Sequence, residues 1–208
     1  MARRTGSSKR WRRRQERDIY VDQANREGWR SRAVFKLEQI NAKERLLKPG
    51  VTCVDLGASP GGWSQLGARL VRPGGRVVAV DLLPMDPIPG VEFLQGDFTS
   101  AETLAALRAL LGDSRVDLVM SDMAPNISGT RAVDQSRSMA LIEEAALFAE
   151  EVLKPGGSLL LKAFQGEGVD GFVKRLGARF GTVKRVKPKA SRPESREIYL
   201  LARNYRMV

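Results

Sequence analysis

Two residues of opposite charge end apolar runs that are typical of neighbouring strands. Asp122 follows the run 116–121, and Lys162 closes the run 158–162. Burying a charge at the end of an apolar strand is costly unless a partner satisfies it. We therefore expect Asp122 and Lys162 to meet at one edge of a sheet, where a lysine could accept a proton during catalysis. The alternative for Lys162 is a surface lysine whose ammonium group reaches water.

The residue types that are missing limit the chemistry further. The chain of 208 residues has no histidine and a single cysteine, Cys53. Without imidazole, Ser-His-Asp and Cys-His catalysis and nearly every zinc site are excluded, so no metal is expected. Proton transfer must use Lys, Asp, Glu, Tyr or water. One cysteine allows no internal disulfide and indicates a reducing compartment.

A glycine-rich turn and a series of aspartates form a second group of candidates. The turn 57–62 follows the apolar run 51–56, and its glycines let the backbone approach a ligand closely. Acids stand at or near four successive strand ends, namely Asp55, Asp81, Asp97 and Asp122. Asp81 is placed to accept hydrogen bonds from a ribose diol, and Asp97 suits an adenine amino group. Any one of these aspartates could instead cap a helix or a turn.

The spacing of the glycines separates two classes of cofactor. A dinucleotide site uses Gly-x-Gly-x-x-Gly and a helix N-terminus for the pyrophosphate. Here the glycines stand at positions 57, 61 and 62, and none stands two residues after Gly57. An acid-rich rim also suits the cationic sulfonium of S-adenosylmethionine better than a pyrophosphate. The pattern therefore favours S-adenosylmethionine over the cofactor of a dinucleotide oxidoreductase.

A sheet is needed to bring these strand ends together. Strand-like runs occupy residues 51–56, 76–81, 91–95, 116–121, 158–162, 182–186 and 197–202. Helical patterns occupy residues 30–47, 63–71, 101–111, 139–153 and 169–178. This alternation predicts an α/β fold with a mostly parallel, seven-stranded sheet and helices on both faces. The strand 197–202 is expected to run antiparallel at the edge side of the sheet. Ligands of such sheets bind beyond the carboxyl ends of the strands.

Positive charge is concentrated near the N-terminus. The chain carries a net charge of +11, and residues 1–17 hold eight basic residues against one acid, Glu16. We predict a basic, flexible arm over 1–17 and one domain over 18–208. A polyanion would neutralise such an arm, and arginine suits RNA because it both pairs with phosphate and stacks on bases. A solubilising tail or weak adhesion to anionic lipid is the alternative. A second basic cluster contains Lys184, Arg185, Lys187, Lys189 and Arg192.

Sequence signals for membranes and secretion are missing. No run of about 18 apolar residues is present, which predicts no membrane span. The basic N-terminus leads into no apolar segment of the kind that a secretory signal requires. We therefore expect a cytoplasmic protein.

Over residues 18–208 the sequence resembles the FtsJ/RrmJ (RlmE) family of ribosomal RNA 2′-O-methyltransferases. The resemblance rests on five segments in this order: 31–37, 55–63, 121–126, 161–162 and 195–199. It implies a Rossmann-like methyltransferase fold and a catalytic tetrad of Lys36, Asp122, Lys162 and Glu197. The implied cofactor residues are Gly61, Trp63, Asp81, Asp97 and Asp122, and the pattern described above adds Asp55, Gly57 and Gly62 as candidates.

The resemblance also implies an activity and a partner. The reaction would move the methyl group of S-adenosylmethionine to a ribose 2′-hydroxyl. For the bacterial branch, the implied target is a uridine in the A-loop of 23S rRNA within the large ribosomal subunit, modified by a monomer. Lys162 would act as the base, Asp122 would orient it, and Lys36 and Glu197 would position the ribose. A tRNA 2′-O-methyltransferase of the same family and a non-catalytic ribosome assembly factor remain open.

Overall fold

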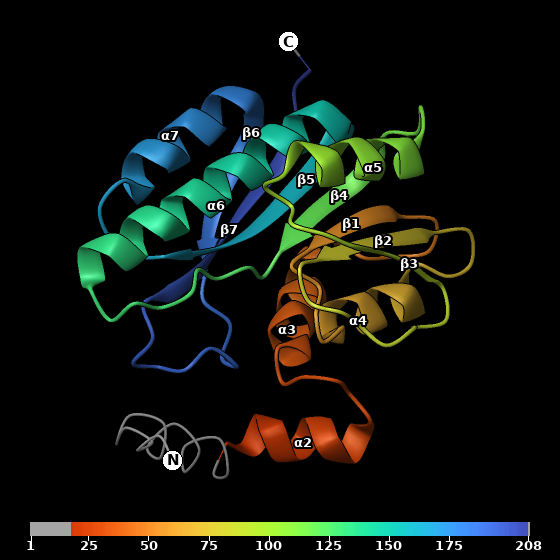
Figure 1. The fold of residues 1–208 in the computed structure, drawn as a ribbon, viewed down its shortest axis with the longest axis horizontal. Coiled ribbons are helices and arrows are strands. Elements are labelled where there is room, and N and C mark those ends of the chain that lie inside the picture. The colour runs from red at the N-terminus through yellow and green to blue at the C-terminus, as the bar shows by residue number, and fades with distance from the viewer. Residues whose placement is uncertain (1–17, 208) are drawn as a thin grey trace.

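A single mixed sheet organises the part of the chain that the computed structural model describes, residues 18–207. The expected basic arm, residues 1–17, lies outside the described residues. The strand order is β3-β2-β1-β4-β5-β7-β6 (Figure 1). The strands are β1 (Thr52–Leu56), β2 (Arg76–Asp81), β3 (Val91–Gln95), β4 (Val116–Ser121), β5 (Leu153–Phe164), β6 (Phe180–Val186) and β7 (Glu197–Tyr205). The predicted α/β class and seven-stranded, mostly parallel sheet are confirmed.

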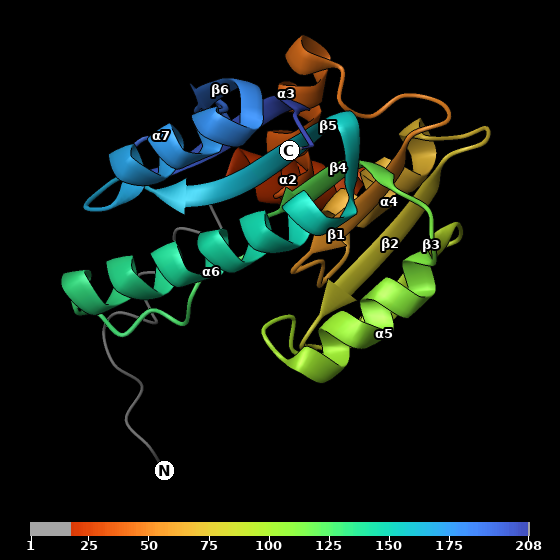
Figure 2. The ribbon, with the colours of Figure 1, turned by 90° about the horizontal axis from the view of Figure 1, so that it is seen from above.

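Helices cover both faces of this sheet (Figure 2). The helices of the described residues are α2 (Ile19–Glu27), which lies apart from the sheet, and α3 (Val34–Glu44), α4 (Gly62–Leu70), α5 (Ala101–Leu111), α6 (Arg131–Val152) and α7 (Val169–Arg179). Apolar side chains of α5, α6 and α7 pack with one face of the strands, and those of α3 and α4 pack with the other. Because successive strand residues point to opposite faces, β7 places Leu200 in the first of these cores and Leu201 in the second.

The last strand is antiparallel, as expected, but it does not lie at the edge. β7 pairs with β5 on one side and with β6 on the other, antiparallel to both. The edge strand is β6, whose residues are mostly exposed or partly exposed, whereas the first six residues of β7 are all buried. The run 197–202 thus belongs to an interior strand. Side chains on both faces of such a strand are buried, which explains its nearly continuous apolar sequence.

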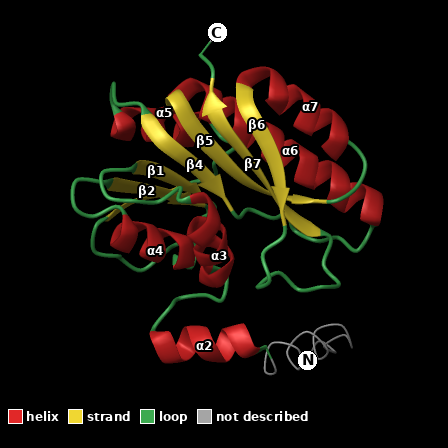
Figure 3. Ribbon diagram, turned by 180° about the vertical axis from the view of Figure 1, so that it is seen from behind, coloured by secondary structure: helices red, strands yellow, loops and turns green. Residues whose placement is uncertain are grey.

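Two helices differ from the sequence prediction. The sequence pattern did not predict α2, which begins after an Asp18 N-cap and ends at Gly28 in the left-handed region, with a φ of 73°. Figure 3 shows α2 lying apart from the sheet, below α3. The second difference is α6, which begins at Arg131, eight residues before the predicted start. No described helix is both long and apolar enough to cross a membrane.

Candidate active site

The register of three strands brings the predicted catalytic side chains together. Ser121 of β4 pairs with Leu161 of β5, so the next residues, Asp122 and Lys162, leave the two strands side by side. Across the antiparallel pair of β5 and β7, Lys162 stands opposite Tyr199. Alternation along β7 then puts Glu197 on the same face as Tyr199. This face is the one that α3 covers.

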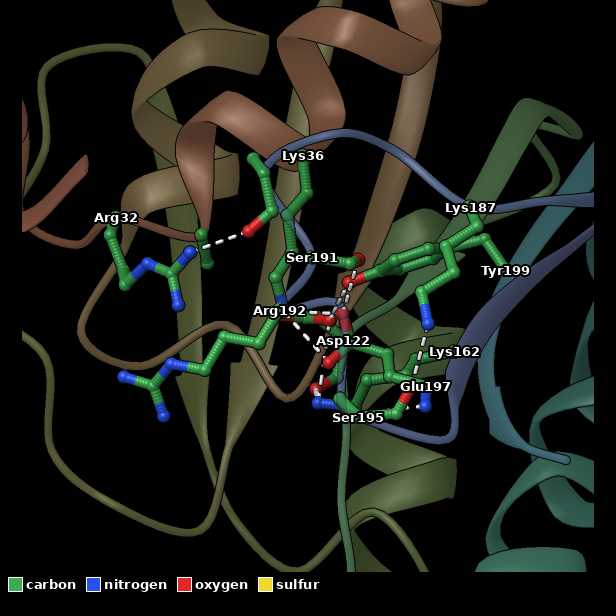
Figure 4. Close-up of polar contacts among 12 residues, drawn as sticks. Arg32, Lys36, Asp122, Lys162, Lys187, Ser191, Arg192, Ser195, Glu197 and Tyr199 are labelled. Carbon is green, nitrogen blue, oxygen red and sulfur yellow. Dashed lines mark hydrogen bonds and ion pairs between the residues drawn. The ribbon is translucent and has the colours of Figure 1, made fainter. Parts of the chain in front are cut away.

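Lys162 and Asp122 form the first of two lysine–carboxylate pairs (Figure 4). Lys162 Nζ lies 3.3 Å from Asp122 Oδ1 and also donates to the backbone carbonyl of Asp122. Both side chains are mostly buried, with exposed fractions of 10% and 16%. The contact predicted from the two strand ends is therefore present, and Lys162 is not a surface lysine.

Lys36 and Glu197 form the second pair. Lys36 lies on α3, and its Nζ is 2.8 Å from each carboxylate oxygen of Glu197 on β7. Both residues are buried. Glu197 also accepts a 2.7 Å hydrogen bond from Ser191 Oγ at Oε1. Pairing removes most of the cost that either buried charge would carry alone. The two pairs together are the tetrad that the family resemblance implied.

Tyr199 joins the two pairs. Its hydroxyl donates a 2.6 Å hydrogen bond to Asp122 Oδ1, and its ring centre lies 5.9 Å from Lys36 Nζ. Burial and the neighbouring Asp122 carboxylate hold the pKa of Tyr199 well above its usual value, so the phenol stays a donor. The Trp63 ring packs on Tyr199 at 5.7 Å between centres. Tyr199 was not among the predicted site residues, although its place two residues after Glu197 on one strand was a usable signal.

A cleft of about 830 Å³ opens beside Asp122 at the carboxyl ends of β1, β2 and β4. It is lined by three predicted cofactor residues besides Asp122, namely Gly57, Asp81 and Asp97. Two exposed apolar side chains of the loop after β2, Leu82 and Leu83, also line it. Carboxylates next to exposed apolar surface suit a ligand that has both polar and aromatic parts.

Asp81 and Asp97 are fixed by local hydrogen bonds. The two oxygens of Asp81 accept from the backbone amides of Ser59 and Leu83, both at 2.8 Å. Asp97 Oδ1 accepts from the hydroxyl and the amide of Thr99, and these bonds lower the pKa of Asp97. Both carboxylates are therefore held in a defined orientation as acceptors on the wall of the cleft.

The glycine turn packs tightly against its surroundings. Gly57 has a φ of 76°, and a Cβ there would lie 2.3 Å from Met123 Cγ. Gly61 and Gly62 are not among the residues that line the cleft. A Cβ on Gly61 would meet Ile88 and Met85, and one on Gly62 would meet the Ser31 hydroxyl. These two glycines allow neighbouring loops to approach the turn.

Asp55 and Trp63 lie behind the cleft rather than on its wall. Asp55 Oδ2 accepts a 2.6 Å hydrogen bond from Ser64 Oγ, whereas Oδ1 is buried without a partner. Burial raises the pKa of Asp55 to about 7. Trp63 Nε1 donates to the carbonyl of Ala33, which N-caps the helix that carries Lys36. Trp63 thus contacts both the start of α3 and Tyr199, and so supports the tetrad. Direct cofactor contacts by these two residues stay predictions.

This arrangement can position a hydroxyl and accept its proton. Within residues 18–207, no group of three or more Cys, Asp and Glu side chains is placed to hold a metal ion. The neighbouring cleft presents oriented carboxylates to a polar ligand. Positioning and proton transfer are the two contributions that a displacement at a methyl group requires from a protein.

Comparison with known proteins identifies the family of the chain. A family model described as FtsJ-like methyltransferase matches residues 29–205. The chain belongs to this family. Solved structures also resemble it, and a candidate ribosomal RNA methyltransferase from Plasmodium falciparum is 30% identical, with a TM-score of 0.78. That match covers 85% of this chain and 98% of the other.

A second solved structure supports the fold of this FtsJ-like methyltransferase. A candidate rRNA methylase from Clostridium thermocellum is 19% identical, with a TM-score of 0.53 over 80% of this chain and 96% of the other. At that identity, the likeness concerns the fold alone. The family match explains why the motifs occur in this order along the chain, and the structure shows that their side chains converge.

Proposed function

We propose that this FtsJ-like methyltransferase methylates the 2′-hydroxyl of a uridine ribose in the A-loop of 23S rRNA, within the large ribosomal subunit. The observation that carries the proposal is the pair of lysine–carboxylate contacts, joined by Tyr199, beside a cleft with carboxylates on its wall. The ribosomal RNA methyltransferase assignment of the Plasmodium falciparum relative supports an rRNA substrate. We further propose that the protein acts in the cytoplasm as a monomer.

The cleft fits S-adenosylmethionine, which when bound supplies a methyl group activated by a sulfonium. Asp81 would accept from the ribose diol of the cofactor, and Asp97 would face its adenine. Leu82 and Leu83, which are 64% and 61% exposed, would gain cover from the adenine ring. Gly57, which has no side chain, would let the cofactor approach the backbone of the turn closely. The acidic rim also attracts the positive charge of the sulfonium.

Lys162 is the group that would take the proton of the 2′-hydroxyl. Its Nζ has two acceptors, the backbone carbonyl and the Oδ1 of Asp122. A neutral amine has two N–H groups and one lone pair. With its N–H groups directed at the carbonyl and at Oδ1 of Asp122, the amine would keep that lone pair to accept the proton as the oxygen attacks. Asp122 therefore orients the base, and Tyr199 in turn orients Asp122.

Lys36 and Glu197 would hold the ribose. Their mutual contacts hold the Lys36 ammonium, at the start of α3, against the Glu197 carboxylate, at the start of β7. A donor and an acceptor held in this way can bind neighbouring hydroxyl groups of one sugar, and a well-oriented hydroxyl contributes a large part of the rate of transfer.

Basic residues around the tetrad would hold the RNA backbone. Arg192 and Lys187 lie on the loop between β6 and β7, and Arg32 precedes α3. Arg32 and Arg192 share the Asp18 carboxylate, at 3.0 Å and 3.3 Å. This contact brings the start of the described chain, and with it the attachment point of the basic arm, next to the loop beside Glu197.

The test offers the protein labelled S-adenosylmethionine with three RNAs: large subunits that lack the modification, free 23S rRNA and bulk tRNA. Alkaline resistance then maps any label, because 2′-O-methylation protects the adjacent phosphodiester. Label at one uridine of the subunit is the expected result. Label on tRNA alone would overturn the substrate and keep the chemistry. Cofactor binding without transfer to any RNA would favour a non-catalytic assembly factor.

Lys162→Ala tests the role of the base. The variant should lose methyl transfer by at least about a hundredfold, a typical contribution of a positioned acid or base. Its affinity for S-adenosylmethionine should stay within several-fold, since Lys162 does not line the cleft. Lys154→Ala is a matched control, because Lys154 lies on the same strand and also pairs with an aspartate, Asp117. Near-normal turnover of Lys162→Ala would remove it from this role.

A further inference from the structure

The loop between β6 and β7, residues 187–196, is held in a defined shape beside the tetrad. Lys187 Nζ donates to the carbonyls of Pro193 and Ser195, at 3.2 Å and 2.7 Å, and so closes the loop on itself. The amide of Ser191 donates to the Pro188 carbonyl at 3.0 Å. The loop starts at the edge strand and ends at Glu197.

Residues on and before α3 attach the loop to the helix that carries Lys36. Gln39 Oε1 accepts a 3.0 Å hydrogen bond from the amide of Ala190, and Arg32 donates to the Ala190 carbonyl. The backbone N–H and carbonyl of Ala190 are thus both hydrogen-bonded by side chains on or just before α3. The position of Ser191, the next residue, is therefore tied to α3 as well as to β7.

Ser191 contacts the carboxylate of Glu197 directly (Figure 4). Its Oγ donates to Glu197 Oε1 at 2.7 Å, and the residue is 3% exposed. The last torsion of a glutamate has a broad energy minimum, and one ammonium nitrogen shared by both oxygens constrains the plane of the carboxylate less than a second, separate donor does. A buried hydroxyl with a fixed backbone restricts this plane further, because a charge-assisted hydrogen bond is short and directional.

We propose that Ser191 is a positioning residue for methyl transfer. It holds the plane of the Glu197 carboxylate, so that Glu197 and Lys36 present one fixed acceptor and one fixed donor to the ribose. The proposal rests on the proposed function, because it concerns the orientation of the ribose in that reaction. Ser191 has no place on the wall of the cofactor cleft.

The first experiment measures steady-state methylation of unmodified large subunits by the full chain and its Ser191→Ala variant. The kcat of the variant should fall about tenfold or more, the usual effect of losing a hydrogen bond to a charged group. Its affinity for S-adenosylmethionine should be unchanged. Ser191→Thr and Ser191→Val form an isosteric pair that differs in the hydroxyl alone. Threonine should restore most of the loss relative to valine, even where both variants are less stable.

The second experiment asks whether Ser191 acts through Glu197. In a Glu197→Ala background, the further change Ser191→Ala should reduce kcat less than twofold, because no carboxylate remains to be positioned. Ser195→Ala is the control from the same loop. Its hydroxyl accepts from the backbone amide of Glu197, which the background variant retains. Any loss caused by Ser195→Ala should therefore persist in that background.

Four outcomes would overturn the inference. Equal kcat values for the wild-type protein and Ser191→Ala would remove Ser191 alone and leave the proposed function intact, as would equal values for the threonine and valine variants. Independent losses in the Glu197→Ala background would show that Ser191 acts by another route. A wild-type protein that methylates no RNA would overturn the proposed function and the role of Ser191 together.

Discussion

Individual carboxylates at the strand ends differ in how the fold treats their charge. Asp97 is exposed and accepts two hydrogen bonds from Thr99, so its ionised form is favoured. Asp55 is buried, and its single hydrogen bond from Ser64 does not offset the loss of water. Its pKa is raised from 3.8 to about 7, and the nearby Asp122 and Asp81 charges add to the effect. The same residue type therefore carries a charge at one strand end and holds a proton at another.

The raised pKa of Asp55 predicts how stability varies with pH. Between about pH 4 and pH 7 the unfolded chain has released this proton and the folded chain keeps it, so this group favours folding less as pH rises. Asp55→Asn cannot titrate. The free energy of unfolding of the wild-type protein relative to Asp55→Asn should therefore fall with rising pH, by at most about 4 kcal/mol. Urea unfolding at several pH values measures this. A constant difference would contradict a buried proton.

The tetrad shows how far residue patterns predict contacts. Asp122 and Lys162 were predicted from the strand ends, because parallel neighbours deliver adjacent residues to one edge. Lys36 and Glu197 are 161 residues apart, and each alone has the pattern of a solvated surface charge. Only the family resemblance indicated them. No rule of local spacing could pair a helix residue with the first residue of a strand so distant in the sequence.

The two helices that differ from the prediction lack the usual buried apolar face. One, α6, buries polar residues in its first turns, and the other, α2, buries a single residue. The first turns of α6 bury Asp134, Gln135 and Ser138 where a helix usually buries apolar residues, so no hydrophobic period marks them. The single buried residue of α2 is Ala24. The sequence signals for α2 were the residues that cap it, Asp18 at the N-terminus and Gly28 at the C-terminus. Most strands, in contrast, were located to within a few residues, since they are short apolar runs bounded by turns, although β5 begins five residues before its predicted start.

Position 57, in the turn after β1, requires glycine for two reasons: its φ is positive, and a side chain there would meet Met123. Gly57→Ala would place a Cβ 2.3 Å from Met123 Cγ and displace the segment that carries Asp122. We expect at least a tenfold loss of affinity for S-adenosylmethionine, measured by calorimetry. Gly28→Ala is the matched control, with a φ of 73° and no atom within 4 Å of the new Cβ. It should cost only the backbone strain, about 1–2 kcal/mol of stability. Equal affinities of the two variants for S-adenosylmethionine would contradict the steric conflict between residue 57 and Met123.

Charge is distributed unevenly over the whole molecule. Residues 1–17 carry +7 of the net charge of +11 and are attached at Asp18, which contacts Arg32 and Arg192 beside the tetrad. Under the proposed function, RNA bound at the tetrad would lie near the residue to which this basic segment is attached. Long-range attraction between this end of the protein and phosphate should increase the rate of encounter at low salt.

Deletion of residues 1–17 tests this at the scale of the molecule. Affinity should fall for all RNAs alike, and the slope of log K against log salt should become shallower by about 0.9 for each phosphate that the protein no longer neutralises. Filter binding at several salt concentrations measures both quantities. Replacing the eight basic residues of the arm by glutamine separates charge from length and should give the same result. An unchanged slope would show that the arm does not bind RNA.

The interior position of β7 has a consequence for the order of events during synthesis. Domains fold from the N-terminus as the ribosome releases the chain. Until residues 197–205 emerge, β5 and β6 have nothing between them, and Lys36 has no Glu197 to contact. The segment that fills the gap in the sheet is also the one that supplies the final member of the tetrad. A chain that stops before residue 197 therefore lacks both the strand that joins β5 to β6 and the carboxylate that pairs with Lys36.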